Sequence, residues 1–139
     1  MPRVRSMVGV LLLLGAGPAR AEMLSYDVDL RGANEVPPND SPGSGKARIT
    51  FDTDTRAVTW AVTYSGLTGA VTGAHFHGAT DAGRNAGIVI HFRGSLDSPI
   101  TGSTVLTEAQ AADFQAGRWY VNVHTARHPG GELRGQVVR

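Results

Sequence analysis

The chain has 139 residues, no cysteine and a formal net charge of +1. This length fits one ordinary domain, and the lack of cysteine excludes both a disulfide framework and a thiolate metal site. The near-neutral charge, without a cluster of lysine and arginine, gives no sign of a nucleic-acid partner. Because the chain has no cysteine, any metal site must use histidine, carboxylate or backbone ligands.

Residues 1–21 have the pattern of a secretory signal peptide. Two arginines open it, residues 7–14 form an apolar stretch, and residues 19–21 read Ala-Arg-Ala, a small-residue cleavage site. An uncleaved anchor is the alternative, but the stretch is shorter than the roughly 20 residues that span a bilayer. Cleavage after Ala21 removes three of the 13 basic residues and leaves 10 against 12 acidic ones in residues 22–139. We therefore expect a periplasmic or secreted protein, with no membrane contact after cleavage.

Apolar and polar residues alternate along most of the chain, and turn residues recur at intervals of about 8–12 positions, which predicts an all-β sandwich or barrel. In chain order, we expect strands at 24–30, 46–51, 57–64, 71–77, 88–92, 101–106, 119–124 and 132–138. One helix is predicted at 107–117, because Thr107 and Gln110 fit a capping box and Gly117 suits the position after a helix end. The proline-rich coil at 31–45 is expected to cross between strands or to lie at an edge.

The sequence Gly-Ala-His-Phe-His-Gly at 73–78 is the clearest sign of chemistry in the chain. In a strand, His75 and His77 point to one face while Phe76 points to the core. Neutral imidazole is the commonest metal ligand among side chains, so the pair predicts half of a metal site. A polar strand surface without a metal is the alternative for the same motif.

The same alternation places two later residues on an outer polar face. The side chain of His124 points to the face opposite the apolar residues of its strand, and that of Arg134 does the same in the next predicted strand. If these strands adjoin the first histidine strand, three imidazoles and one guanidinium share a solvent-facing surface. Ring nitrogens that bind one ion would then lie within about 4 Å of one another. The alternative for Arg134 is an ion pair with Glu132 on the same face.

Two histidines remain to be placed. His128 lies in the turn His-Pro-Gly-Gly, from which a loop histidine can swing onto a metal, so we expect it as the fourth ligand. A solvated turn residue is the alternative. His91 alternates with the apolar residues of its strand, which favours a hydrogen-bonded core histidine, with a ligand role as the alternative.

Four segments resemble the CHRD domain, which is named for its occurrence in chordin and is widespread in exported bacterial proteins. They are residues 30–38 (Leu-Arg-Gly-Ala-Asn-Glu-Val-Pro-Pro), 73–78, 120–125 and 128–136, in the family's order. The resemblance implies a single CHRD domain at 22–139. Because chordin binds other proteins, it also implies an alternative function, a non-catalytic extracellular module with a protein partner.

The histidine motifs are also similar to those of Cu,Zn superoxide dismutase, which implies a Greek-key β-sandwich or barrel of about eight antiparallel strands. By this resemblance, His75, His77 and His124 would bind copper. Arg134 would attract superoxide to the metal. The chain lacks that family's cysteine pair, and residues 78–87 contain no histidine for a zinc subsite. We therefore expect copper alone, the divalent ion with the highest affinity for such ligands, and the implied activity is that of a copper-only superoxide dismutase.

Overall fold

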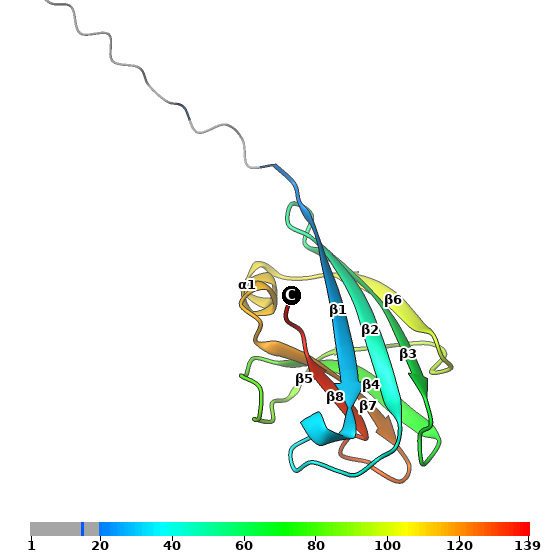
Figure 1. The fold of residues 1–139 in the computed structure, drawn as a ribbon. Coiled ribbons are helices and arrows are strands. Elements are labelled where there is room, and N and C mark those ends of the chain that lie inside the picture. The colour runs from blue at the N-terminus through cyan, green and yellow to red at the C-terminus, as the bar shows by residue number, and fades with distance from the viewer. Residues whose placement is uncertain (1–14, 16–19) are drawn as a thin grey trace, which may run out of the picture.

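The computed structural model describes residue 15 and residues 20–139, so most of the predicted signal peptide lies outside the described residues. Eight strands, one α-helix and one short 3-10 helix form the described part of the chain (Figure 1). The strands are β1 (Met23–Arg31), β2 (Ser44–Asp52), β3 (Ala57–Ser65), β4 (Val71–Gly78), β5 (Ile88–His91), β6 (Ile100–Val105), β7 (Trp119–Thr125) and β8 (Leu133–Gln136). The helices are η1 (Gly32–Asn34) and α1 (Glu108–Gln115). The prediction of an all-β fold with one short α-helix is confirmed.

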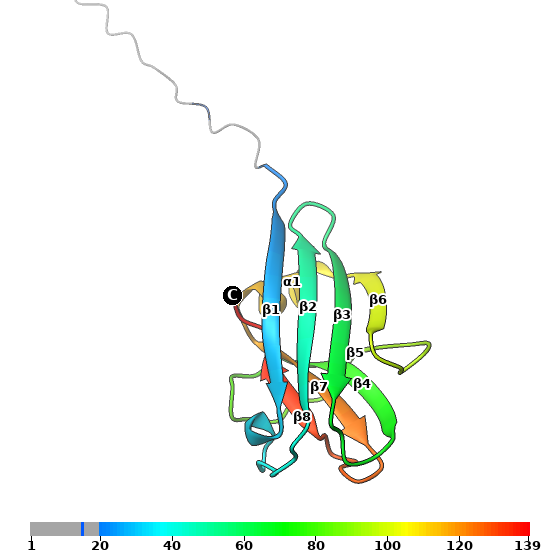
Figure 2. The same cartoon turned by 45° about the vertical axis from the view of Figure 1, so that its right-hand side comes forward.

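All eight strands belong to one curled antiparallel sheet, in the order β5-β4-β7-β8-β1-β2-β3-β6. One wall of the curl contains β1, β2, β3 and β6, and the other contains β5, β4, β7 and β8 (Figure 2). The connections from β3 to β4, from β5 to β6 and from β6 to β7 cross between the walls. β5 and β6 are the two edges of the sheet, so the barrel stays open between them.

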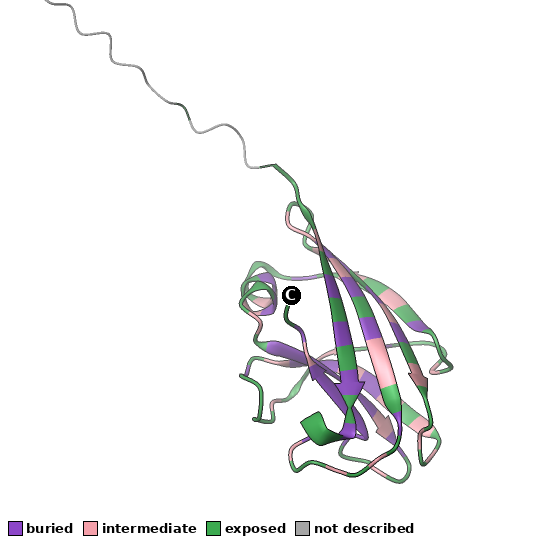
Figure 3. Cartoon of the chain, in the orientation of Figure 1, coloured by how far each residue is buried: buried purple, intermediate pink, exposed green. Residues whose placement is uncertain are grey.

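The core lies between the two walls. Inward residues alternate with exposed ones along β1, where Tyr26, Val28 and Leu30 are buried, and Figure 3 shows this as alternating bands. Helix α1 closes one end of the core, because Phe114 packs against Tyr26 and Phe51 with ring centroids 5.0 and 5.1 Å apart. Aromatic side chains bury more apolar area than any others, so these contacts contribute much of the core's stability.

Helix α1 begins where the sequence predicts it. Thr107 Oγ1 accepts a hydrogen bond from the Gln110 amide at 3.1 Å, and Gln110 Oε1 accepts one from the Thr107 amide at 3.0 Å. Gly117 follows the helix with φ of +75°, a conformation that glycine adopts more readily than other residues. The capping box and the glycine after the helix end are therefore both confirmed.

The outer face of β7 and β8 is not solvent-facing, so that part of the prediction is wrong. Four polar side chains of this face are at most 2% exposed: Tyr120, Asn122, Glu132 and Arg134. Residues 32–43 and 79–87 pass over them and supply hydrogen-bond partners, so that Asn39 Nδ2 donates to the Glu132 carbonyl and Ser41 Oγ to the Glu132 carboxylate. The face is polar because its partners are other protein groups rather than water.

No helix among the described residues is long and apolar enough to cross a membrane.

Candidate metal centre

His75 and His77 lie on the outer side of β4 because the residue between them fills the core. Phe76 is fully buried and packs against Trp60 and Trp119, with ring centroids 5.6 and 5.4 Å apart. The pleat therefore turns both imidazoles to the opposite face. Their rings lie 5.5 Å apart between centroids.

His124 joins this pair from β7, the strand that neighbours β4. The ring of His124 lies 4.9 Å from that of His75 and 5.9 Å from that of His77, between centroids. One nitrogen from each of the three rings lies within 4.8 Å of the others. Nitrogens that share one ion at 2.0–2.1 Å are at most about 4.2 Å apart, so small ring rotations would complete the approach. The structure thus brings together three of the histidines expected to act as ligands.

Each ring offers a nitrogen that has no hydrogen-bond partner among the residues that the structure describes. The Nδ1 atoms of His77 and His124 face the carbonyl oxygens of Ala86 and Pro129, at 3.0 and 2.8 Å. A carbonyl only accepts, so these Nδ1 atoms carry the protons and the Nε2 lone pairs are free. Both Nε2 atoms, together with Nδ1 of His75, are buried without a partner. A metal ion is the kind of group that satisfies three such nitrogens at once.

The surroundings of His75 and His77 favour the neutral form of these two rings. Burial and the neighbouring His124, His77 and His91 lower the pKa of His75 to about 4. Burial also lowers the pKa of His77, although the Ala86 carbonyl acts in the opposite direction. Neutral imidazole is the form that binds metals, so His75 and His77 are in a ligand-competent state at neutral pH.

Arg134 lies close to the histidines but inside the protein. Its guanidinium carbon sits 3.5 Å from the centroid of the Tyr120 ring, and that ring stacks on His77 with centroids 4.7 Å apart and planes within 3°. The side chain is 2% exposed and donates to Asn85 Oδ1 and the Arg84 carbonyl. The alternative pairing with Glu132 is not observed, because that carboxylate accepts from the hydroxyl groups of other residues.

The two remaining histidines lie outside the group of three. The backbone of His128 closes a turn, with its amide donating to Thr125 Oγ1 and its carbonyl accepting from Gly131. Its role as a fourth ligand remains a prediction. His91 pairs with His75 across β5 and β4, and their rings are 4.9 Å apart between centroids. His91 is exposed, so its interpretation as a core residue is wrong: it lies on the edge strand β5, on the same face as His75.

Sequence reasoning missed Glu35, a buried carboxylate beside the same polar layer. It is 6% exposed, and no group in the described part of the chain forms a hydrogen bond with its Oε2 atom. Burial raises its pKa to about 7, against the opposing effects of Arg134 and Asn122. A Cβ atom at Gly131 would collide with both Glu35 Oε2 and Asn122 Nδ2. The side chains of Glu35 and of Asn122 on β7 therefore both lie against the backbone of Gly131. The glutamate lies in a coil without periodicity, so no pattern marked it as buried.

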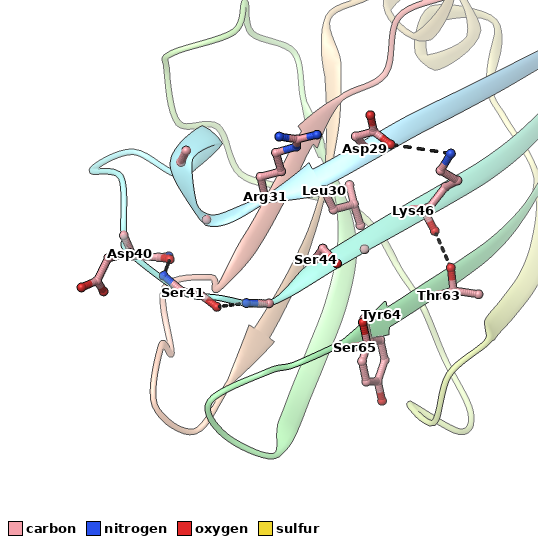
Figure 4. Close-up of a pocket in the computed structure, with 15 residues that line it drawn as sticks. Asp29, Leu30, Arg31, Asp40, Ser41, Ser44, Lys46, Thr63, Tyr64 and Ser65 are labelled. Atoms are coloured by element: carbon pink, nitrogen blue, oxygen red, sulfur yellow. Dashed lines mark hydrogen bonds and ion pairs between the residues drawn. The ribbon is translucent and has the colours of Figure 1, made fainter.

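A separate hollow of about 930 Å³ lies at the ends of β1, β2 and β3 (Figure 4). The charged residues of its lining are Asp29, Arg31, Asp40 and Lys46, and none of its lining residues is a histidine. The Lys46 ammonium is 3.7 Å from carboxylate oxygens of both Asp27 and Asp29, so its charge is already balanced. This hollow does not contribute to the histidine cluster.

The model of the CHRD domain family matches residues 26–137, which is most of the chain. The protein belongs to the CHRD domain family. A search of curated proteins gave no significant match, and a search of solved structures gave none either. The histidine cluster lies within the matched part of this CHRD domain, with its three residues on β4 and β7.

Proposed function

We propose that this CHRD domain binds one copper ion through His75 Nδ1, His77 Nε2 and His124 Nε2. The observation that carries the proposal is the approach of three imidazoles, with one nitrogen of each within 4.8 Å of the others. Each ring also has a buried nitrogen without a hydrogen-bond partner among the described residues. Imidazole suits copper, zinc and nickel, and copper has the highest affinity of these for nitrogen ligands. The motif's similarity to the copper site of Cu,Zn superoxide dismutase favours the same metal.

The residues around the cluster have defined tasks in this proposal. The carbonyls of Ala86 and Pro129 hold the Nδ1 protons, which leaves each Nε2 lone pair directed at the ion. The Tyr120 ring stacks on His77 and restricts its rotation. Copper bound here would supply one-electron chemistry between its +2 and +1 states.

We limit the proposal to metal binding and do not extend it to superoxide dismutation. The expected anion-attracting group, Arg134, is 2% exposed, and both of its terminal nitrogens donate to loop oxygens. A guanidinium in this position has little surface to offer a small anion. The proposed location is the periplasm or the cell exterior, on the basis of the signal-peptide pattern.

Copper stoichiometry tests the proposal. The processed, metal-free protein is dialysed against a buffer that contains copper, zinc and nickel at equal, limiting concentrations, and bound metal is measured by mass spectrometry. We expect about one copper per chain and loss of that copper in His77→Ala. His128→Ala tests the predicted fourth ligand: weaker copper binding there would support this role, and unchanged binding would show that three histidines suffice. Zinc or nickel bound in place of copper would refute the choice of metal, and no metal bound in the unmodified protein would refute the site.

A further inference from the structure

The loop at 79–87 covers the outer face of β4, β7 and β8, and side chains of these strands hold it in place. Gln136 Nε2 donates to the Thr80 carbonyl at 3.0 Å. The Tyr120 hydroxyl donates to the Ala86 carbonyl and accepts from the Ala86 amide, each at 3.1 Å. His77 Nδ1 donates to the same Ala86 carbonyl at 3.0 Å. The position of Ala86, near the end of the loop, therefore determines the position of the acceptor for this ring.

Arg134 makes the strongest of these loop contacts. One terminal nitrogen donates to Asn85 Oδ1 at 2.9 Å and the other to the Arg84 carbonyl at 2.6 Å. Charged donors form shorter and stronger hydrogen bonds than neutral ones. No carboxylate oxygen among the described residues lies within 4.0 Å of this guanidinium. Loop oxygens and the face of the Tyr120 ring therefore make the direct contacts with the buried charge, and the Glu35 carboxyl group interacts with it from a greater distance.

We propose that Arg134 is a positioning residue: it clamps residues 84 and 85 so that the next carbonyl, that of Ala86, holds the Nδ1 proton of His77. A ring held in this way keeps the Nε2 lone pair free. Without the clamp, the Tyr120 hydroxyl and the Gly78–Gly87 backbone hydrogen bond alone hold this end of the loop, so the Ala86 carbonyl is less firmly placed and the proton can transfer to Nε2. The consequence for copper rests on the proposed function, whereas the effect on the His77 tautomer does not.

His124 provides an internal reference for this proposal. Its Nδ1 proton is held by the Pro129 carbonyl, in a different loop that Arg134 does not contact. A general loosening of the fold would affect both rings. Loss of the clamp affects His77 alone.

Nuclear magnetic resonance of the metal-free protein, labelled with ¹⁵N in histidine, measures the tautomer of each ring at pH 8. We expect both His77 and His124 of the unmodified protein to carry the proton on Nδ1. In Arg134→Gln, the ¹⁵N shifts of His77 should move toward an average of the two tautomers, while those of His124 stay unchanged. Copper affinity, measured separately, should fall about tenfold, as for other residues that orient metal ligands.

Arg118→Gln is the matched control, because Arg118 lies 3.9 Å from Asp81 in the same loop but both side chains are largely exposed. It should leave both tautomers unchanged. Asn85→Ala removes one acceptor of the clamp from an exposed loop position and should move His77 in the same direction, even if Arg134→Gln fails to fold.

If the His77 ring still occurs only as the Nδ1-protonated tautomer in either clamp variant, the proposal is overturned. Equal changes in the ¹⁵N shifts of His77 and His124 would overturn it as well. A tautomer change at His77 alone, in a protein that binds no copper, supports the positioning role and refutes the copper site.

Discussion

Glu35→Gln is expected to stabilise the protein at alkaline pH, because the native carboxyl group is buried. Glu35 is 6% exposed, and burial raises its pKa from 4.5 to about 7, while Arg134 and Asn122 lower it in part. Between these pH values the folded state binds more protons than the unfolded chain. The free energy of unfolding therefore falls as the pH rises from 4.5 through 7, and the penalty is complete above that range.

The size of the effect follows from the difference between the two pKa values. One pKa unit corresponds to about 1.36 kcal/mol, so a difference of about 2.5 units gives a penalty of about 3 kcal/mol at pH 8. Glutamine resembles the protonated carboxyl group and carries no such penalty. We expect Glu35→Gln to unfold at a urea concentration about 2 M higher than the unmodified protein at pH 8, and at a similar concentration near pH 4.

Urea unfolding of the metal-free protein at pH 4, 6 and 8, followed by tryptophan fluorescence, measures this difference. Trp60 and Trp119 are both buried, so their emission reports on the core. Glu22→Gln makes the same chemical change at an exposed position and serves as the control. A difference between Glu35→Gln and the unmodified protein that is the same at pH 4 and pH 8 would refute the raised pKa.

Three further substitutions test the framework around the site. Glu132→Gln should lower the free energy of unfolding by about 2 kcal/mol at pH 7. Burial raises the pKa of Glu132, but its hydroxyl and amide donors outweigh this and lower it to about 2, so its stabilisation is present above pH 4.5 and is lost as the pH falls toward 2. Phe76→Ala removes a fully buried ring and should cost about 3–5 kcal/mol in urea unfolding. Thr107→Ala removes the N-cap acceptor of α1 and should cost about 1 kcal/mol, measured in the same way.

Each of these substitutions has an outcome that contradicts its reasoning. A Glu132→Gln protein with the same deficit at pH 2.5 as at pH 7 would show that the carboxylate charge is not what the donors stabilise. Phe76→Leu is the milder control for the core, and a loss as large as that of Phe76→Ala would point to ring geometry rather than volume. Thr107→Ser keeps the hydroxyl acceptor, so a loss equal to that of Thr107→Ala would exclude capping as the cause.

Local alternation was sufficient to predict the directions in which the three clustered histidines point. Phe76 is strongly apolar between two polar neighbours, so the strand's period of two fixes which way His75 and His77 point. His124 follows from the same rule, because apolar residues occupy the alternate positions of β7. The capping box of α1 is equally local, since its two hydrogen bonds join residues three positions apart.

The covering of the outer face could not be predicted, because contacts between distant segments determine it. Ser41 reaches Glu132 across 91 positions, and Arg134 reaches Arg84 across 50. Coils have no periodicity from which such contacts can be read. Alternation therefore identified the polar face of β7 and β8 correctly but gave no information on whether water or another segment covers it, and Glu35 was missed for the same reason.

The ligands of copper are counted most directly by electron paramagnetic resonance of the protein loaded with one equivalent of Cu(II). The proposed site predicts nitrogen hyperfine structure from three imidazoles, and His77→Ala should reduce this number to two or abolish binding. His91→Ala, which removes an exposed ring beside His75, should leave the spectrum unchanged. A spectrum without nitrogen coupling, or one that does not change in His77→Ala, would contradict the proposed copper site.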